Sequence, residues 1–381
     1  MDAQPLERPA RSGRAPAIGF GRRGALKGFL SFAAAATLLA FVLPRAAGAG
    51  WGTIVSTLGG VSVLALAGLG VVWFAGLLAH MVVMTSALPG LTVRRALLLS
   101  LTGSSVSNVL PMGGAAGTAL NYSMCRRWGH SRAAFVLFSV VTHIWGLVAK
   151  LLLPALAMAG LLVAGRPSAH LAVACGVALA ALVVLVTGLA GVLARESAAV
   201  ALGRAGERAV SFAGRRARRP WRVELQAPAR ALRKQAIAMT RSHWHRPATG
   251  MLLYFGLQAV LLSMCLQAVG GPMSPLYVFA AYAVERLLTV VVLTPGGLGF
   301  VEVTMTAMLV AFGATPVAAA AGVLLYRAFT FALEIPVGGA LLLGWLAAQR
   351  WSGQADPALV PFDPLGSAPV ALHPELAGVA A

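Results

Sequence analysis

The sequence has few charged residues and even fewer acidic ones. Only 11% of its 381 residues are charged, whereas a soluble domain carries about 25%. Hydrophobic residues make up 59% of the chain, and the mean hydropathy is +0.81. This composition excludes a soluble globular domain. It predicts an all-α polytopic membrane protein, because helices satisfy their own backbone hydrogen bonds in lipid.

Cysteines and catalytic motifs are also scarce. Three dispersed cysteines, with no CxxC pattern, argue against a disulfide framework or a metal site. The sequence has no HExxH motif, no Walker motif and no GxGxxG followed by a strand, and no Asp lies in a predicted span. A site built from Ser105 and His143 has no motif to support it. We therefore predict that the chain is not an enzyme and uses no metal and no cofactor.

Basic residues are the charges that the sequence does have. Thirty Lys and Arg against 11 Asp and Glu give a net charge of +19. In a membrane protein such an excess gathers on cytoplasmic loops, so we attribute it to topology and expect no nucleic acid partner. The basic tail 1–24 and the loop 195–247, with 13 Lys or Arg and three Glu, are predicted to be cytoplasmic. The tail 348–381 is predicted to be cytoplasmic and disordered.

The membrane domain is predicted over residues 25–347, in the inner cell membrane with both termini cytoplasmic. A span needs about 20 apolar residues. Six full spans are predicted near residues 25–44, 53–86, 133–164, 170–194, 248–269 and 316–346. The first apolar run also resembles a signal peptide, but its length and its long basic leader favour an uncleaved span.

Two pairs of shorter apolar pieces lie between these spans, at 96–110 with 115–125 and at 276–293 with 300–313. A helix of about 15 residues reaches only about 22 Å, short of the ~30 Å hydrocarbon core. We interpret each pair as a re-entrant hairpin, with eight full spans as the alternative. The flanking charges place the hairpins on opposite sides of the membrane. The result is an inverted repeat, which is typical of transporters.

Glycine and proline break each hairpin, and the residues at the breaks are candidate binding residues. Free backbone N–H groups at the start of a half-helix can hold an anion such as a phospholipid phosphate. The alternative is that these glycines only allow helices to pack closely. The candidates are Asn108, Pro111, Gly113, Gly114, Gly117, Pro295, Gly296, Gly297 and Gly299.

Ionisable residues inside the membrane are expensive unless they are paired or hydrated. Six are predicted there: Lys150, Glu285, Arg286, Glu302, Arg327 and Glu334. Glu302 and Arg327 lie beside the second break or on the following span, so they join the candidate site. The alternative for all six is a structural role, as ion pairs that hold helices together.

Three segments resemble a known family. They are Asn108-Val109-Leu110-Pro111-Met112-Gly113-Gly114 with Gly117, Thr294-Pro295-Gly296-Gly297-Leu298-Gly299-Phe300-Val301-Glu302, and Leu325-Tyr326-Arg327-Ala328-Phe329-Thr330 continuing to Pro336-Val337-Gly338-Gly339. The family is that of flippase-like membrane proteins related to the transmembrane part of lysylphosphatidylglycerol synthases. The resemblance covers roughly residues 25–347. One departure is Thr118, where many relatives carry an acidic residue.

The resemblance implies translocation of a lipid or a lipid-linked amphiphile. The expected partners are membrane lipids, in particular an anionic phospholipid or a lipid-linked substrate, and a homodimer is left open. Bifunctional synthases add a soluble aminoacyl-transfer domain after the membrane part. Only residues 348–381 follow here, so we expect no such activity. The alternative function is a membrane accessory subunit for a lipid or envelope enzyme.

Overall fold

The structure is a computed structural model, and it describes residues 33, 36–46, 48–110, 113–166, 169–216, 224–290 and 297–351. Every regular element within these ranges is a helix. The predicted basic tail 1–24 and residues 352–381 of the predicted C-terminal tail lie outside the described residues, as does half of the predicted first span 25–44. The last helix continues to Trp351, beyond the predicted domain boundary at residue 347.

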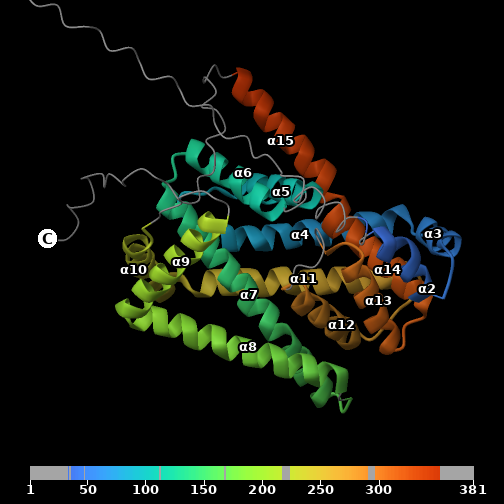
Figure 1. Cartoon of the computed structure of the whole chain (residues 1–381). Coiled ribbons are helices and arrows are strands. Elements are labelled where there is room, and N and C mark those ends of the chain that lie inside the picture. The colour runs from blue at the N-terminus through green and yellow to red at the C-terminus, as the bar shows by residue number, and fades with distance from the viewer. Residues whose placement is uncertain are drawn as a thin grey trace, which may run out of the picture.

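Five helical segments are long and apolar enough to cross a membrane, which confirms a polytopic helical membrane protein. They are the segments found within the described ranges, namely Val63–Ala87, Arg132–Val163, Ala172–Ala194, His245–Ala268 and Pro316–Gln349. Helices α4 (Val63–Ala87) and α11 (His245–Ala268) run side by side through the bundle (Figure 1). Helices α7 (Arg132–Val163) and α8 (Ala169–Ala194) form another pair beside them.

The last spanning segment is a rod made of three parts. Helix α14 (Pro316–Arg327) is followed by a π-helical turn, η3 (Ala328–Ala332), and then by α15 (Glu334–Trp351). The π-turn inserts one extra residue into the helical repeat. Turns of this kind are frequent at functional sites.

The predicted span 53–86 is wrong as a single helix. The structure divides it into α3 (Trp51–Gly59) and α4, after the short helical segments η1 (Leu38–Val42) and α2 (Leu43–Ala46). Helix α3 ends at two consecutive glycines, which favour helix ends. Ser62 then caps α4, because its hydroxyl oxygen accepts a hydrogen bond from the Ala65 backbone N–H at 3.2 Å.

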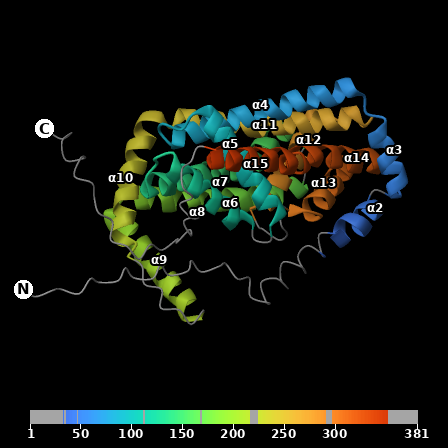
Figure 2. The ribbon, with the colours of Figure 1, turned by 90° about the horizontal axis from the view of Figure 1, so that it is seen from above.

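Four shorter helices form the two predicted broken pairs. Helix α5 (Val93–Val109) packs against α6 (Gly113–Arg127), and α12 (Pro275–Leu288) packs against α13 (Phe300–Ala311). At 1.5 Å per residue, α12 and α13 extend only about 21 and 18 Å. The two pairs lie toward opposite ends of the bundle, with α5 and α6 nearer to α10 and with α13 against α2 (Figures 1 and 2).

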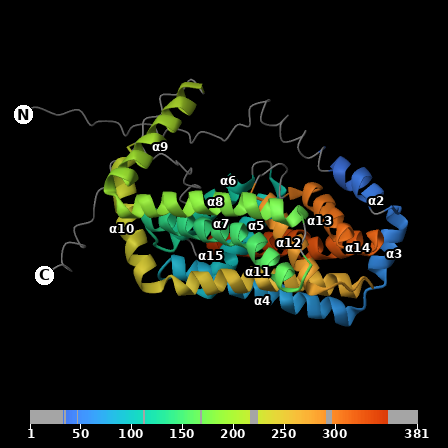
Figure 3. The ribbon, with the colours of Figure 1, turned by 90° about the horizontal axis from the view of Figure 1, so that it is seen from below.

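The predicted polar loop contains two amphipathic helices, α9 (Glu196–Arg216) and α10 (Gln226–His243). Both lie at the end of the bundle away from α3. Helix α10 packs along this end against α7 and α8. Helix α9 points sideways out of the bundle (Figures 2 and 3).

The largest hydrophobic core lies where α11, α12, α13 and α14 meet. Tyr282 and Tyr326 are its largest fully buried side chains. Small residues let the helices approach closely. A Cβ on Gly322, for example, would lie 2.6 Å from a methyl group of Leu266. This packed core holds most of the ionisable residues that the sequence placed in the membrane.

Candidate functional site

The second break separates α12 from α13, and glycines with left-handed backbone angles end it. Gly297 has a φ of 72° and Gly299 a φ of 76°, a region that residues with a side chain rarely adopt. Gly299 is the residue from which α13 starts. The predicted site residues Pro295 and Gly296 lie outside the described residues. The break therefore aims the first turn of α13, with Glu302, into the core.

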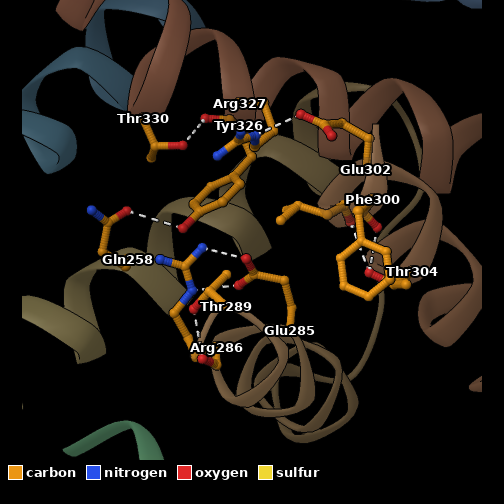
Figure 4. A network of polar contacts seen from close by, with 11 residues as sticks. Gln258, Glu285, Arg286, Thr289, Phe300, Glu302, Thr304, Tyr326, Arg327 and Thr330 are labelled. Atoms are coloured by element: carbon orange, nitrogen blue, oxygen red, sulfur yellow. Dashed lines mark hydrogen bonds and ion pairs between the residues drawn. The ribbon is translucent and has the colours of Figure 1, made fainter. Parts of the chain in front are cut away.

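Glu302 and Arg327 form a buried ion pair (Figure 4). Arg327 Nε donates to Glu302 Oε1 at 2.7 Å, and the two residues are 9% and 1% exposed. Glu302 lies in the first turn of α13 and Arg327 in the last turn of α14. Both helix dipoles favour these charges. The guanidinium also lies over the Phe331 ring, 4.7 Å from its centroid.

The second carboxylate oxygen of Glu302 has no hydrogen-bond partner among the described residues. Glu302 Oε2 is buried and accepts no hydrogen bond from the described residues, and the hydroxyl of Thr306, one turn further along α13, also has no partner among them. Buried polar atoms nearly always find a partner. These two oxygens on one helix face are open to a further donor, which a water molecule, a bound group or a residue outside the described ranges can supply.

A second ion pair lies on the other side of the Tyr326 ring (Figure 4). It joins the sequence neighbours Glu285 and Arg286 near the end of α12, and the Glu285 side chain is 1% exposed. Arg286 also lies over the Tyr282 ring, 5.3 Å from its centroid.

Tyr326 links this region to α11. Its hydroxyl donates to Gln258 Oε1 at 3.2 Å (Figure 4). An amide that receives a buried hydrogen bond across two helices fixes their register. The two ion pairs are therefore held on a rigid frame.

The remaining predicted charges complete two groups of opposite sign. Glu334, at the start of α15, interacts electrostatically with Arg327 and lies within hydrogen-bonding reach of Ser104. Lys150, on α7, interacts electrostatically with Arg286 and Glu285. One group thus has two carboxylates around a guanidinium, and the other has two cations around a carboxylate.

The first break is built differently. Gly113 and Gly117 are buried against α5, where a Cβ on either would overlap Ser107, whereas a Cβ on Gly114 would meet open space. Asn108 is half-buried near the end of α5, and Pro111 lies outside the described residues. For Gly113 and Gly117 the structure supports close helix packing, the alternative to anion binding.

Helix α5, the first helix of the first hairpin, packs against α15. Ser105 Oγ donates to the Ile335 carbonyl oxygen at 2.9 Å. A Cβ on Gly338 would overlap the Leu101 carbonyl. Through these contacts and through Ser104 beside Glu334, the first hairpin reaches the charged group around Arg327.

The sequence pattern did not indicate that Tyr326 and Gln258 form a polar link or that Gly338 is a packing residue. A single amide in an otherwise apolar span was the available signal for Gln258. Ser105 and His143, which no motif links, have separate partners: Ser105 binds α15, and His143 Nδ1 lies 2.6 Å from the carbonyl oxygen of Ser139. Among the described residues no group of His, Cys, Asp and Glu could hold a metal ion.

Together these features define a polytopic helical membrane protein with a buried charge network beside a broken helix. The comparison with protein families agrees with this class. A family model described as the lysylphosphatidylglycerol synthase TM region matches residues 28–338. The chain belongs to this family, as the three sequence motifs predicted. No curated protein shows a match to the chain.

Proposed function

We propose that the protein is a flippase-like transporter that moves a lipid or a lipid-linked amphiphile across the cell membrane, and that it is not an enzyme by itself. The observation that carries this proposal is the buried Glu302–Arg327 pair, in which the second carboxylate oxygen accepts no hydrogen bond from the described residues. A charge buried at membrane depth is costly and usually marks a substrate or ion pathway.

The chemistry of the pair suits a lipid headgroup. A phosphate competes with Glu302 for the guanidinium of Arg327, since arginine binds phosphate and carboxylate with the same donors. Hydroxyl or ammonium groups of the headgroup would satisfy Glu302 Oε2. The proposed site thus exchanges an internal ion pair for contacts to the substrate.

The arrangement of the short helices supports this mechanism. Two broken hairpins toward opposite ends of the bundle are what an inverted repeat requires, and the basic residues on α9 and α10 favour a cytoplasmic position for that end. In this proposal the inner membrane holds the protein with both termini in the cytoplasm. Rocking of one half against the other would expose the Arg327 region to each side in turn.

The test is lipid translocation in vesicles that contain the purified full chain. Headgroup-labelled anionic and zwitterionic phospholipids are placed in both leaflets, and a membrane-impermeant reductant reports how much label reaches the outside. We expect loss of the protected fraction with the wild-type chain. Wild-type protein that leaves every lipid class unmoved, and instead co-purifies with a stoichiometric partner, would favour the accessory-subunit alternative.

A charge-swapped variant separates binding from structure. Glu302→Arg combined with Arg327→Glu keeps an ion pair but reverses its polarity. If the pair serves the substrate, the folded double variant loses translocation. If the pair only holds α13 against α14, the folded double variant translocates like the wild type, although the reversed charges oppose both helix dipoles and lower its stability. The matched control is Glu196→Gln, which breaks an exposed ion pair with Arg230.

A further inference from the structure

Helix α9 has one face that is already occupied. Ala199 and Val200 are buried there, and Gly203 and Gly206 lie against the start of α10. A Cβ on Gly203 would lie 3.0 Å from the Leu225 carbonyl oxygen, and one on Gly206 would lie 2.9 Å from a Leu225 methyl group. This inner face therefore packs against α10 and leaves no room for another partner.

Polar contacts fix the hairpin of α9 and α10. Glu207 Oε1 accepts from the Leu225 backbone N–H at 2.7 Å, and Oε2 accepts from the Gln226 amide at 3.2 Å. Arg230 pairs with Glu196 at 3.1 Å. Two separate sets of contacts, one at Glu207 and one at Glu196, thus fix the position of α9 relative to α10.

The same hairpin is tied to a spanning helix. Arg233, on α10, donates to the carbonyl oxygens of Val192, Leu193 and Ala194, at 3.0–3.3 Å, where α8 ends. The α8 segment is one of the five that can cross a membrane. The hairpin therefore sits at the level where α8 leaves the bilayer. Trp244, at the junction of α10 and α11, is 55% exposed, and tryptophan is enriched at that level.

The opposite face of α9 is apolar and exposed. Leu202 is 61% exposed and Phe212 is 60% exposed, with the exposed residues Ala205 and Ala209 between them. Spacings of three, four and three residues place all four on one stripe of the helix. We call these four residues the α9 apolar stripe.

Arginines line the edge of this stripe. Arg204, Arg208 and Arg215 are exposed and recur at spacings of four and seven residues, so they form a neighbouring stripe. An apolar stripe bordered by basic residues is the pattern of a helix that lies in the plane of a membrane surface. Figures 2 and 3 show α9 leaving the bundle sideways, as such a position requires.

We propose that α9 is an interfacial helix, with its apolar stripe inserted between the headgroups of an anionic leaflet and its arginines bound to lipid phosphates. The occupant of this face is the bilayer surface itself. Anionic lipid complements the excess of basic residues in segment 195–247. This inference does not rest on the proposed transport, because an interfacial helix can anchor a protein that moves no lipid.

The experiment places a spin label on the stripe of the full chain in nanodiscs. Ala209→Cys carries the label on the stripe, and Ser197→Cys carries it on the arginine side of the same helix. Cys175→Ala is included in both, since Cys125 and Cys265 are fully buried. The ratio of collisions with oxygen to collisions with a water-soluble nickel chelate reports membrane depth, because oxygen concentrates in lipid.

We expect a several-fold higher oxygen-to-nickel ratio at position 209 than at position 197, in nanodiscs that contain phosphatidylglycerol. The difference should shrink in pure phosphatidylcholine. Equal, water-like ratios at both positions would overturn the proposal. Dipolar broadening at position 209 that depends on two chains per disc would also overturn it, by assigning the stripe to a second copy.

Two serines test the same proposal without a label. The double variant Leu202→Ser and Phe212→Ser removes the large apolar groups of the stripe without touching the inner face. We expect the full chain to remain monodisperse, with the cleavage of α9 by added protease in phosphatidylglycerol nanodiscs several-fold faster than in the wild type. Unchanged protection of α9 in this variant would contradict a membrane-bound stripe.

Discussion

Glu302 and Arg327 are 25 positions apart in the sequence, and their charged atoms lie 2.7 Å apart. The contact joins the first turn of α13 to the last turn of α14. The contact lies beside the break before α13. Among the described residues, this break combines glycines in left-handed backbone angles with a buried charge. The stability of this contact and of its surroundings can be measured apart from transport.

The first prediction concerns the ion pair itself. Glu302→Gln leaves Arg327 buried beside a neutral amide, and removing one partner of a buried pair costs roughly 3–5 kcal/mol. We expect a clearly lower melting temperature in detergent, measured by size-exclusion chromatography after heating. Glu196→Gln should change it little, because an exposed pair contributes about 0–1 kcal/mol. Equal melting of both variants would contradict the prediction.

The second prediction concerns the link between α5 and α15. Gly338→Ala places a methyl group on the Leu101 carbonyl, and such overpacking costs about 1–3 kcal/mol. The control is Gly344→Ala on the same helix, where nothing lies within 4 Å. The control should be neutral or slightly stabilising, since alanine favours helices over glycine. A Gly338→Ala protein as heat-stable as the control would show that the helices separate easily.

The third prediction concerns the start of α13. Gly299→Ala forces a residue with a side chain to a φ of 76°, which costs about 1–2 kcal/mol. Gly256→Ala, in the middle of α11 with open space around it, is the control. The comparison uses thermal unfolding in the same detergent. If both alanines behave alike, the left-handed angle does not contribute to the position of Glu302.

The fourth prediction concerns Tyr326. Tyr326→Phe removes the donor to Gln258 and leaves a buried amide unsatisfied, at about 1–3 kcal/mol. Gln258→Leu removes the amide, and the double variant removes both groups. We expect the double variant to be less destabilised than the sum of the two single variants. Additive effects in this cycle would show that the hydrogen bond contributes nothing beyond the separate side chains.

The fifth prediction concerns pH and the hairpin of α9 and α10. The backbone N–H of Leu225 is the main cause that lowers the pKa of the Glu207 carboxyl, with a smaller contribution from the Gln226 side chain. Because the pKa of Glu207 is lowered in the folded hairpin, its carboxylate stabilises the hairpin at pH values above the ordinary carboxyl pKa. This stabilisation is lost as the pH falls through the lowered pKa. The distance between spin labels on α9 and α10 should therefore broaden in acid.

The matched variant for this pH effect is Glu207→Gln. The amide retains an acceptor for the Leu225 N–H but does not titrate in this range. Its label distances should be broader than those of the wild type near neutral pH and should not respond to acid. A wild-type hairpin that stays closed while the carboxyl is protonated would rule out Glu207 as its pH-sensitive contact.

The sequence predicted the helical class and most long spans because apolar length is a local property. Helices α7, α8 and α11 begin and end within a few residues of their predicted limits. The sequence did not predict the division of 53–86 into α3 and α4, because two glycines and a serine lower the mean hydropathy of this run only slightly. Their effect on helix ends depends on the cap that Ser62 makes.

The candidate site was predictable only in part. The sequence indicated the charge of Glu302 and the glycine-rich segment before it. The structure brings Glu302 next to Arg327 as expected. The roles of Gly113 and Gly117 were not visible, because glycine serves both anion binding and close packing. The structure adds that both glycines lie closely against Ser107. The Tyr326–Gln258 bond spans 68 positions, so no local pattern contains it.

The rod from α14 to α15 also provides a reference for membrane depth. Near its end, the Arg127 guanidinium lies 5.5 Å from the centroid of the Trp345 ring, and Arg127 also contacts Gln349. Arginine and tryptophan gather at the headgroup boundary. Residues 327 to 345 cover about 27 Å of helix, and α15 is inclined to α4 and α11 (Figure 1). An upright rod would place Arg327 about 3 Å from the opposite boundary of a ~30 Å hydrocarbon core. The inclination of the rod therefore decides how far inside that boundary the Glu302–Arg327 pair lies.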